Sequence, residues 1–159
     1  KGVPFMPLGG LIGSDVVRNR DDWKVIDDPL GRGGGPVVLL PAIKPDVALF
    51  HSSRADKNGN VWIGRRRELM TMAHASRKAL VTVEEIEDKD FLEDENLAAG
   101  TLPALYVEAI AKAEEGAWPQ ALSGCYERDL DHIRAYAELA KTTEGFQNYL
   151  AAQVLGGGA

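Results

Sequence analysis

The residues best suited to chemistry lie within the stretch 45–86, where His51, Ser52 and Ser53 stand side by side. A histidine close to a hydroxyl can serve as a general base that activates a nucleophile. Neighbouring residues of a strand point to opposite faces of its sheet, however, so adjacent positions make a poor base and nucleophile pair. The trio therefore does not indicate nucleophilic catalysis by itself.

Two carboxylates, Glu84 and Glu85, follow directly on the apolar run 80–83. Proteins of the α/β class gather functional groups at the carboxyl ends of parallel strands, so this position is suited to a site. The acidic residues that follow, from Glu87 to Glu95, are expected to form a solvated surface. For one of Glu84 and Glu85 two roles stay open, which are lining a site and making a structural hydrogen bond.

Three consecutive cations, Arg65, Arg66 and Arg67, stand at the expected start of a helix. Positive charge there opposes the helix dipole and costs a few tenths of a kcal/mol per exposed residue. Something anionic could offset that cost. The sequence leaves three sources open: the acidic stretch 84–95 of the same chain, a partner subunit, or the phosphates of a nucleotide-like ligand.

Other familiar chemistries are not supported by the spacing. His51, His74 and His132 lie far apart and none has a second ligand type at metal-site spacing, so we predict no metal site. The glycines of 31–36 precede a strand and lack the Lys-Ser/Thr ending of a phosphate loop, so we interpret them as a flexible turn that could line a site. Cys125 has no activating cation beside it.

Composition restricts the class of protein. The chain has 159 residues, of which 45% are hydrophobic, enough for one buried core. A formal net charge of −6 argues against a broad nucleic-acid-binding face. The single cysteine suits a reducing compartment, and no apolar run approaches the roughly 18 residues needed to span a bilayer. We expect a cytoplasmic protein that binds neither nucleic acid nor membrane.

The elements that must position these residues can be read from local patterns. The apolar runs 47–50 and 80–83 are typical of strands buried in a parallel sheet. Between them, Asn58-Gly59 predicts a reversal over 56–60 before a short strand at 61–63, with Asp56 bracing the turn. Apolar residues at helical spacing then predict a helix over 67–76, which gives a βαβ-like crossover.

The flanking segments give weaker signals. Ser14 is predicted to cap a short helical turn, and short strands are expected at 23–26 and 37–40. The segment 106–113 fits a strand and a helix equally well. Helices are predicted over 128–141 and from Thr143 onward, with Thr143 as the cap and a fraying glycine tail at 156–159.

Several short motifs, read together, extend over nearly the whole chain. They are Pro45-Asp46-Val47-Ala48-Leu49, Arg54-Ala55-Asp56 with Gly59-Asn60, Val83-Glu84-Glu85-Ile86, Pro4-Phe5-Met6-Pro7, Gly13-Ser14-Asp15, Gly33-Gly34-Gly35, Gly116-Ala117 with Pro119, and Tyr126 with Asp129 and His132. In residue type and spacing they resemble the A (alpha) subunit of family I coenzyme A transferases. The flanking motifs resemble its glutaconate CoA-transferase branch.

The resemblance implies an open α/β fold with a mainly parallel sheet flanked by helices, as in sugar-phosphate-isomerase-like domains, and a strand within 106–113. It implies that the partner is a CoA-transferase B subunit, in a hetero-oligomer of AB pairs. In the family that partner carries the nucleophilic glutamate in a Ser-Glu-Asn-Gly type motif, which this sequence lacks. CoA thioester is then a substrate, and no bound cofactor is expected.

A second family feature, the glycine-rich Gly-Gly-Phe signature of the amino-terminal half of the alpha subunit, is also missing. We therefore expect residues 1–159 to be the C-terminal portion of one alpha-subunit domain, inactive alone. We predict no catalytic residue in the chain, and from their positions expect these residues to line the shared cleft: Gly33, Gly34, Gly35, Ser52, Ser53 and Glu84. To the architecture of the turn we assign Asp56, Asn58, Gly59 and Asn60.

Three functions remain open from the sequence. The first is the alpha subunit of an acyl-CoA:carboxylate CoA-transferase. The second, known among relatives of this branch, is a hydrolase of the same fold that opens a ring in a CoA thioester during steroid breakdown. The third is a module that binds an acyl-CoA or a protein without catalysis.

Overall fold

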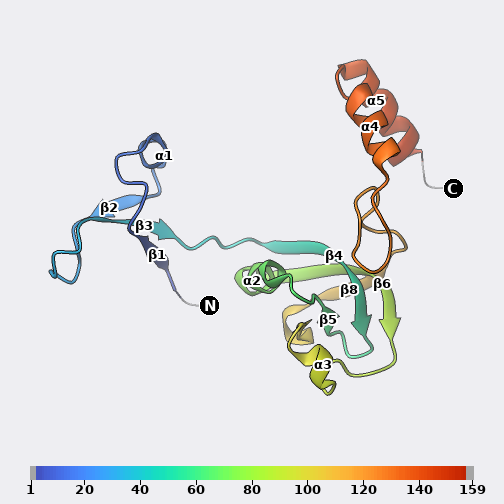
Figure 1. Ribbon diagram of the computed structural model, residues 1–159, viewed down its shortest axis with the longest axis horizontal. Helices are drawn as coiled ribbons and strands as arrows, with labels where there is room; N and C mark the ends of the chain where they lie inside the picture. Colours follow the sequence, from blue (N-terminus) through green and yellow to red (C-terminus); the bar gives the residue numbers. More distant parts are fainter. Residues whose placement is uncertain (1–2, 157–159) are drawn as a thin grey trace.

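The computed structural model describes residues 3–156, arranged as three successive parts (Figure 1). A small antiparallel sheet comes first, a five-stranded sheet with its helices forms the middle, and a pair of helices ends the chain. Of the predicted glycine tail, residues 157–159 lie outside the described range. None of the helices within 3–156 is long and apolar enough to cross a membrane.

The first part is a three-stranded sheet in the order β1-β3-β2, with both pairings antiparallel. Its strands are β1 (Phe5–Leu8), β2 (Lys24–Ile26) and β3 (Val37–Pro41). The short helix α1 (Asp15–Arg18) begins where the Ser14 side chain accepts a hydrogen bond from the Val17 N–H, as predicted. The short strands expected at 23–26 and 37–40 are confirmed within a residue.

The middle part is a five-stranded sheet in the order β7-β5-β4-β6-β8. The long strands β4 (Val47–Asp56) and β6 (Lys78–Glu87) run parallel, and β8 (Ala109–Lys112) runs parallel to β6. The short strands β5 (Val61–Trp62) and β7 (Thr101–Leu102) add antiparallel pairings on the other side. The α/β class is confirmed; the sheet is mixed, and its two longest pairings are the parallel ones.

The core lies between this sheet and helix α2 (Arg67–Ala75). Alternate residues of β4 and β6 are buried against the helix because successive side chains of a strand face opposite ways. Ala48, Val81 and Val83 are buried there, and Ala73 is the buried residue of the helix. Leu49, one position along from Ala48, is 71% exposed. The predicted strands, helix and intervening hairpin are therefore confirmed.

The turn of 56–60 is organised by one carboxylate. Asp56 Oδ1 accepts the N–H groups of Asn58 and Asn60, each at 2.9 Å, and Oδ2 accepts Asn60 Nδ2 at 2.7 Å and Phe91 N at 2.8 Å. Asn60 Oδ1 accepts in turn from Ala104 N at 2.8 Å. Asp56 thus braces its own turn, as expected, and also ties it to two later segments.

Between β6 and β8 the chain forms α3 (Glu95–Ala98), β7 and a 3₁₀ turn, η1 (Ala104–Tyr106). The segment that the sequence left ambiguous therefore holds the end of a 3₁₀ turn and the four-residue strand β8. Pairing with the neighbouring β6 is what defines β8 as a strand, and a local pattern does not reveal such pairing.

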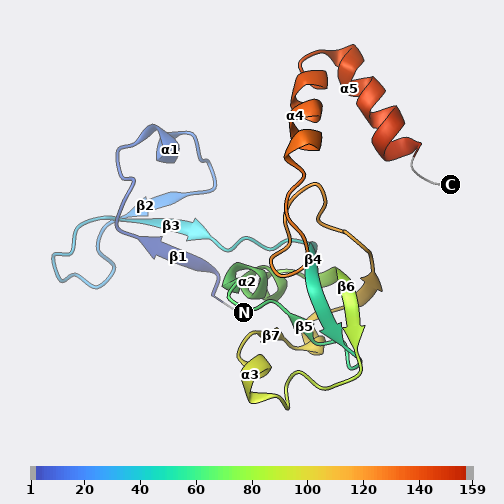
Figure 2. The ribbon, with the colours of Figure 1, turned by 45° about the vertical axis from the view of Figure 1, so that its right-hand side comes forward.

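The last part is a helical hairpin that extends away from the sheet, as two views show (Figures 1 and 2). It comprises α4 (Leu130–Leu139), α5 (Thr143–Leu150) and the π-helical turn η2 (Ala151–Leu155). The cap of α5 is Thr142, whose side chain accepts from Gly145 N, so the prediction of Thr143 is wrong by one residue. Thr142 has the extended backbone that a cap requires.

Candidate functional site

The carboxylate of Glu84 is the centre of a hydrogen-bond network in the carboxyl-terminal half of β6. Its Oε1 lies 2.6 Å from His51 Nε2 and accepts from the Tyr126 hydroxyl at 2.9 Å. The backbone N–H of Glu115 donates to Oε2 at 2.9 Å, and that of Gly116 to Oε1 at 3.2 Å. We call these residues, together with Thr82, the Glu84 network.

His51 enters the network because β4 and β6 are in register. It lies opposite Thr82 in the parallel pairing, and its Nδ1 is 2.9 Å from Thr82 Oγ1. An ionised carboxylate can only accept hydrogen bonds, so His51 Nε2 is the donor in its bond with Glu84. The second contact, between Nδ1 and Thr82 Oγ1, fixes the orientation of the ring.

The Glu84 carboxylate is held in its charged form. Partial burial acts to raise its pKa, but the bonds from the Glu115 N–H, His51, Tyr126 and the Gly116 N–H outweigh burial and lower the pKa below its usual range. Burial raises the pKa of Tyr126, and the bond to Glu84 adds to this effect, so the phenol stays protonated. A carboxylate with four donors is a poor nucleophile and a strong anchor.

What Glu84 anchors is the loop that follows β8. Two backbone N–H groups of the loop bind its carboxylate directly, and the Tyr126 hydroxyl accepts from Ala117 N at 2.8 Å. Gly116 allows the close approach, because a Cβ there would lie 2.5 Å from His51 Nδ1. Of the two roles left open for Glu84, the structural hydrogen bond is therefore observed.

The anchored loop forms one side of a pocket of about 430 Å³. Its opposite sides are β4 at Ser53 and the segment that joins β5 to α2. We call it the Ser53 pocket; its lining residues are Ser53, Trp62, Ile63, Gly64, Arg65, Arg66, Ala121, Leu122 and Ser123. Within the described chain no Asp or Glu lines it. The lining therefore offers two guanidinium groups and two hydroxyls, with apolar side chains beside them.

Ser52 does not line this pocket, but it holds the lining residue Arg66 in place. Its side chain is fully buried, and its hydroxyl donates to the Trp62 carbonyl and accepts from Arg66 Nη2 at 3.0 Å. Arg66 Nε lies 3.5 Å from the Ile63 carbonyl, a second, weaker contact. Of the two serines predicted to line a cleft, Ser53 lines the pocket and Ser52 positions Arg66.

The arginines at the start of α2 have no carboxylate partner among residues 3–156. The acidic stretch pairs with other cations instead: Glu87 binds Arg54 and Lys89, and Asp88 binds Lys57, all at 2.8 Å. The acidic stretch 84–95 therefore does not compensate the charge of these arginines through ion pairs. Arg65 and Arg67 are exposed and Arg66 is half-buried.

The turn that holds the predicted cleft glycines lies in the first part of the chain, away from the Ser53 pocket. Gly33, Gly34 and Gly35 lie between β2 and β3 in the first part, far from β4 and β6 in both ribbon views (Figures 1 and 2). Asp28 holds the turn, accepting the N–H groups of Leu30, Arg32 and Gly34 at 2.8 to 3.0 Å. The structure does not bring these glycines together with Ser53 and Glu84.

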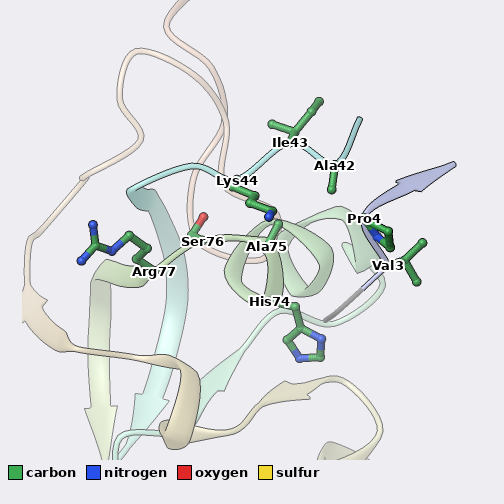
Figure 3. A pocket seen from close by; sticks show the side chains of 9 residues that line it. All are labelled: Val3, Pro4, Ala42, Ile43, Lys44, His74, Ala75, Ser76 and Arg77. Carbon is green, nitrogen blue, oxygen red and sulfur yellow. The ribbon is translucent and has the colours of Figure 1, made fainter. Parts of the chain in front are cut away.

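A second pocket, of about 450 Å³, lies between the first part and the end of α2 (Figure 3). Of its polar side chains, the Ser76 hydroxyl donates to the Met72 carbonyl at 2.8 Å and Arg77 pairs with Asp46 at 3.7 Å, whereas His74 Nε2 is buried with no hydrogen-bond partner among the described residues. His74 packs on Tyr106, with ring centroids 4.0 Å apart. Unlike the Ser53 pocket, which has two arginines, this pocket is lined by one.

Sequence reasoning missed His51 and Tyr126 as partners of Glu84. The pairing with His51 spans 33 residues and that with Tyr126 spans 42. The contact between His51 and Thr82 follows from the register of β4 and β6, which the alternation within each strand does not specify. Tyr126 lies in an irregular loop, where no periodicity could indicate it.

Known proteins resemble the chain over almost all of its length. The alpha subunit of glutaconate CoA-transferase from Acidaminococcus fermentans is 30% identical over 166 residues, covering 93% of this chain and 51% of that protein. The crystal structure of that organism's enzyme matches with a TM-score of 0.84 and 28% identity, over 98% of this chain and 53% of the other.

Two other relatives have different activities. The decarboxylase AibA/AibB matches with a TM-score of 0.76 and 31% identity, over 94% of this chain and 55% of that chain. The IpdA subunit of the cholesterol ring-cleaving hydrolase of Rhodococcus jostii is 29% identical over 161 residues, 97% of this chain and 54% of that protein. The chain thus spans about half the length of these relatives.

The family itself follows from a match to a family model. The model described as coenzyme A transferase matches residues 11–113, which include the Asp56 turn, the arginines, both long strands and Glu84. The match covers more than half of the chain, and the fold agrees with that of glutaconate CoA-transferase. The chain belongs to the coenzyme A transferase family.

Proposed function

We propose that this chain forms part of the alpha subunit of an acyl-CoA:carboxylate CoA-transferase, an enzyme that moves CoA between carboxylic acids. One observation carries the proposal: the Ser53 pocket has guanidinium and hydroxyl groups but, within residues 3–156, no carboxylate. Such a lining suits the binding of an acid and leaves the chemistry to a carboxylate from elsewhere. The expected source is a B subunit, since relatives of this chain are named as one of two kinds of subunit.

The reaction would then proceed on the partner's glutamate. That carboxylate attacks the thioester carbonyl, which forms an acyl-glutamyl anhydride and releases the CoA thiolate. The thiolate attacks the glutamyl carbonyl of the anhydride, forming a glutamyl thioester and freeing the first acid. The second acid takes CoA from that thioester by the same two steps in reverse.

Within this chain, each group has a binding or positioning role. Ser53, Arg65 and Arg66 contact the substrate pair, and Ser52 holds Arg66. Glu84 positions the loop 113–127 that closes the pocket, and does not itself take the acyl group. CoA enters as a thioester substrate, and the assembly consists of AB pairs in the cytoplasm.

The proposal is tested on the native protein that contains this chain. We expect it to purify with a B-like partner and to form acetyl-CoA from an acyl-CoA and free acetate. Purification without any such partner would contradict the transferase assignment. It would favour the third function, a module that binds an acyl-CoA or a protein.

The second candidate, a ring-opening hydrolase, is supported by the similarity to the IpdA subunit. The two activities differ in their products, since a transferase exchanges CoA between acids and the hydrolase cleaves a carbon-carbon bond. A complex that cleaves a ring in a CoA thioester, and exchanges no CoA with acetate, would establish the hydrolase and exclude the transferase.

A further inference from the structure

The helical hairpin of α4 and α5 has no buried residue in either helix within the described chain. The helices have ten and eight residues, and helices shorter than about 12–15 residues are marginally stable in water without tertiary packing. The hairpin extends away from the five-stranded sheet in both ribbon views (Figures 1 and 2). It therefore needs a covering surface that residues 3–156 do not supply.

The charged residues of α4 lie along one side of the helix. Asp131, Arg134 and Glu138 are spaced i, i+3 and i+7, which places them on one face. They are paired locally, Arg134 with Asp131 at 3.3 Å and Glu138 with Lys141 at 2.6 Å. The other sides of α4 carry apolar and aromatic side chains, of which Leu139 is 43% exposed. Charge on one side only is typical of a helix that is covered on its other sides.

A groove of about 280 Å³ lies between the two helices. Ala135 and Leu139 line it from α4, and Tyr149 and Ala152 line it from α5 and η2. The Tyr149 hydroxyl is already engaged, 2.9 Å from His132 Nε2. An open groove with apolar side chains on both walls suits the apolar face of another protein segment.

The hairpin is fixed to the loop that lines the Ser53 pocket. Trp118 of this loop packs on His132, with ring centroids 4.1 Å apart, and its Nε1 donates to Asp129 Oδ2 at 3.3 Å. Asp129 Oδ1 accepts the His132 N–H at 2.8 Å and so caps α4. The preceding residue of the loop, Ala117, donates at 2.8 Å to Tyr126, which anchors the loop to β6. The hairpin is thereby held in a defined position relative to the pocket.

We propose that the groove of the α4–α5 hairpin is a docking surface for the subunit that brings the nucleophilic carboxylate to the Ser53 pocket. This inference rests on the proposed transferase function. One loop forms a wall of the pocket that the carboxylate must reach and also carries the hairpin, so a partner seated at the pocket continues onto the hairpin. A second copy of this chain is a poorer occupant, since each copy carries a net charge of −6.

The docking surface is tested in the native complex with Ala135→Glu, which places a carboxylate in the groove. Ala135 is exposed and glutamate is a good helix former, so the hairpin itself tolerates the change. We expect the dissociation constant of the two subunits, measured by mass photometry over a dilution series, to rise by about tenfold or more, because docking would bury an unpaired charge. Ala151→Glu, at an exposed position outside the groove, is the matched control and should leave it unchanged.

The activity of the same variants separates docking from catalysis. Above the dissociation constant kcat of Ala135→Glu should equal that of the wild type, and on dilution its specific activity should fall at a higher protein concentration. Equal dissociation constants for Ala135→Glu and Ala151→Glu would overturn the proposal. So would a loss of contacts between like subunits alone, which would assign the groove to a second copy. A lower melting temperature at an unchanged dissociation constant would assign it to another part of the same subunit, and would also overturn the proposal.

Hydrogen exchange on the unsubstituted complex provides a test without any variant. We expect the amides of 130–150 to exchange slowly in the intact complex and faster as dilution separates the subunits, since short uncovered helices open readily. Exchange that is independent of subunit association would overturn the docking surface. Groove-dependent binding of the partner in a complex that transfers no CoA would refute the proposed function and keep the docking surface. CoA transfer by a complex whose assembly does not depend on the groove would refute the docking surface alone.

Discussion

The Asp56 turn joins β4 to β5, and the Ser53 pocket is lined by Ser53 and Trp62 of the same two strands, yet the polar groups of the two regions are used in opposite ways. Every oxygen of the buried Asp56 carboxylate is bound within the chain, and the bonds reach Phe91 and the turn itself. In the pocket, Arg65 and most donors of Arg66 have no partner among residues 3–156. Satisfied groups stabilise a fold, and unsatisfied ones are available to a ligand.

The Glu84 network shares a feature with each of these two regions. Its carboxylate is as fully bonded as that of Asp56, but the bonds hold a loop that forms the pocket. Substitutions in the three places should therefore separate stability from substrate choice. The expected loss of stability falls from the Asp56 turn, through the Glu84 network, to the arginines.

The largest effect is expected for Asp56→Ala. It leaves four donors without their acceptor, and each buried unsatisfied group costs about 1–3 kcal/mol. We expect the free energy of unfolding to fall by roughly 3 kcal/mol or more, as measured by urea denaturation. Asp88→Ala, whose side chain is 90% exposed, is the control and should change it by less than about 0.5 kcal/mol. Equal effects of the two would contradict the role given to the turn.

Glu84→Gln should have a smaller effect, of about 2 kcal/mol, because an amide replaces one acceptor oxygen by a donor. The effect should depend on pH. The pKa of Glu84 is lowered in the folded protein, so its contribution is full above the unfolded value near 4.5 and disappears as the pH falls through the folded-state value. Melting temperatures of wild type and variant should therefore converge in acid. The control is Glu85→Gln, at an exposed position, whose melting temperature should match that of the wild type at each pH measured.

Gly116→Ala tests how closely the loop packs on the network. A Cβ would lie 2.5 Å from His51 Nδ1 and 2.6 Å from Cε1, so the loop or the imidazole must shift, at a cost of about 1–2 kcal/mol. Because the loop lines the pocket, KM for the acid should also rise. Gly10→Ala, where a Cβ meets nothing within 4 Å, is the control. A loss of stability with an unchanged KM would separate the loop from the site.

Arg65→Met should have the smallest effect on stability. The residue is exposed, and removing a cation near the start of a helix relieves an unfavourable dipole interaction of a few tenths of a kcal/mol. We expect the melting temperature to stay level or to rise slightly while KM for the acid rises. A clear drop in melting temperature would show that Arg65 has a structural partner.

Much of the fold could be predicted because its signals are local. The apolar runs of β4 and β6, the Asn58-Gly59 reversal and the spacing of α2 each lie within about ten residues of sequence. The site could be predicted only in part. Bonds between Glu84, His51 and Tyr126 depend on strand register and on the path of an irregular loop. The glycine cluster was a local signal too, but it carries no information about where its turn lies in space.

We propose that this chain binds and positions the substrates while its partner in the complex supplies the nucleophile. The most direct test is to incubate the native complex with acyl-CoA, trap the covalent intermediate with borohydride and map the modified residue by mass spectrometry. We expect modification of a glutamate on the partner and none within residues 3–156. Modification of Glu84 would contradict this assignment of the nucleophile.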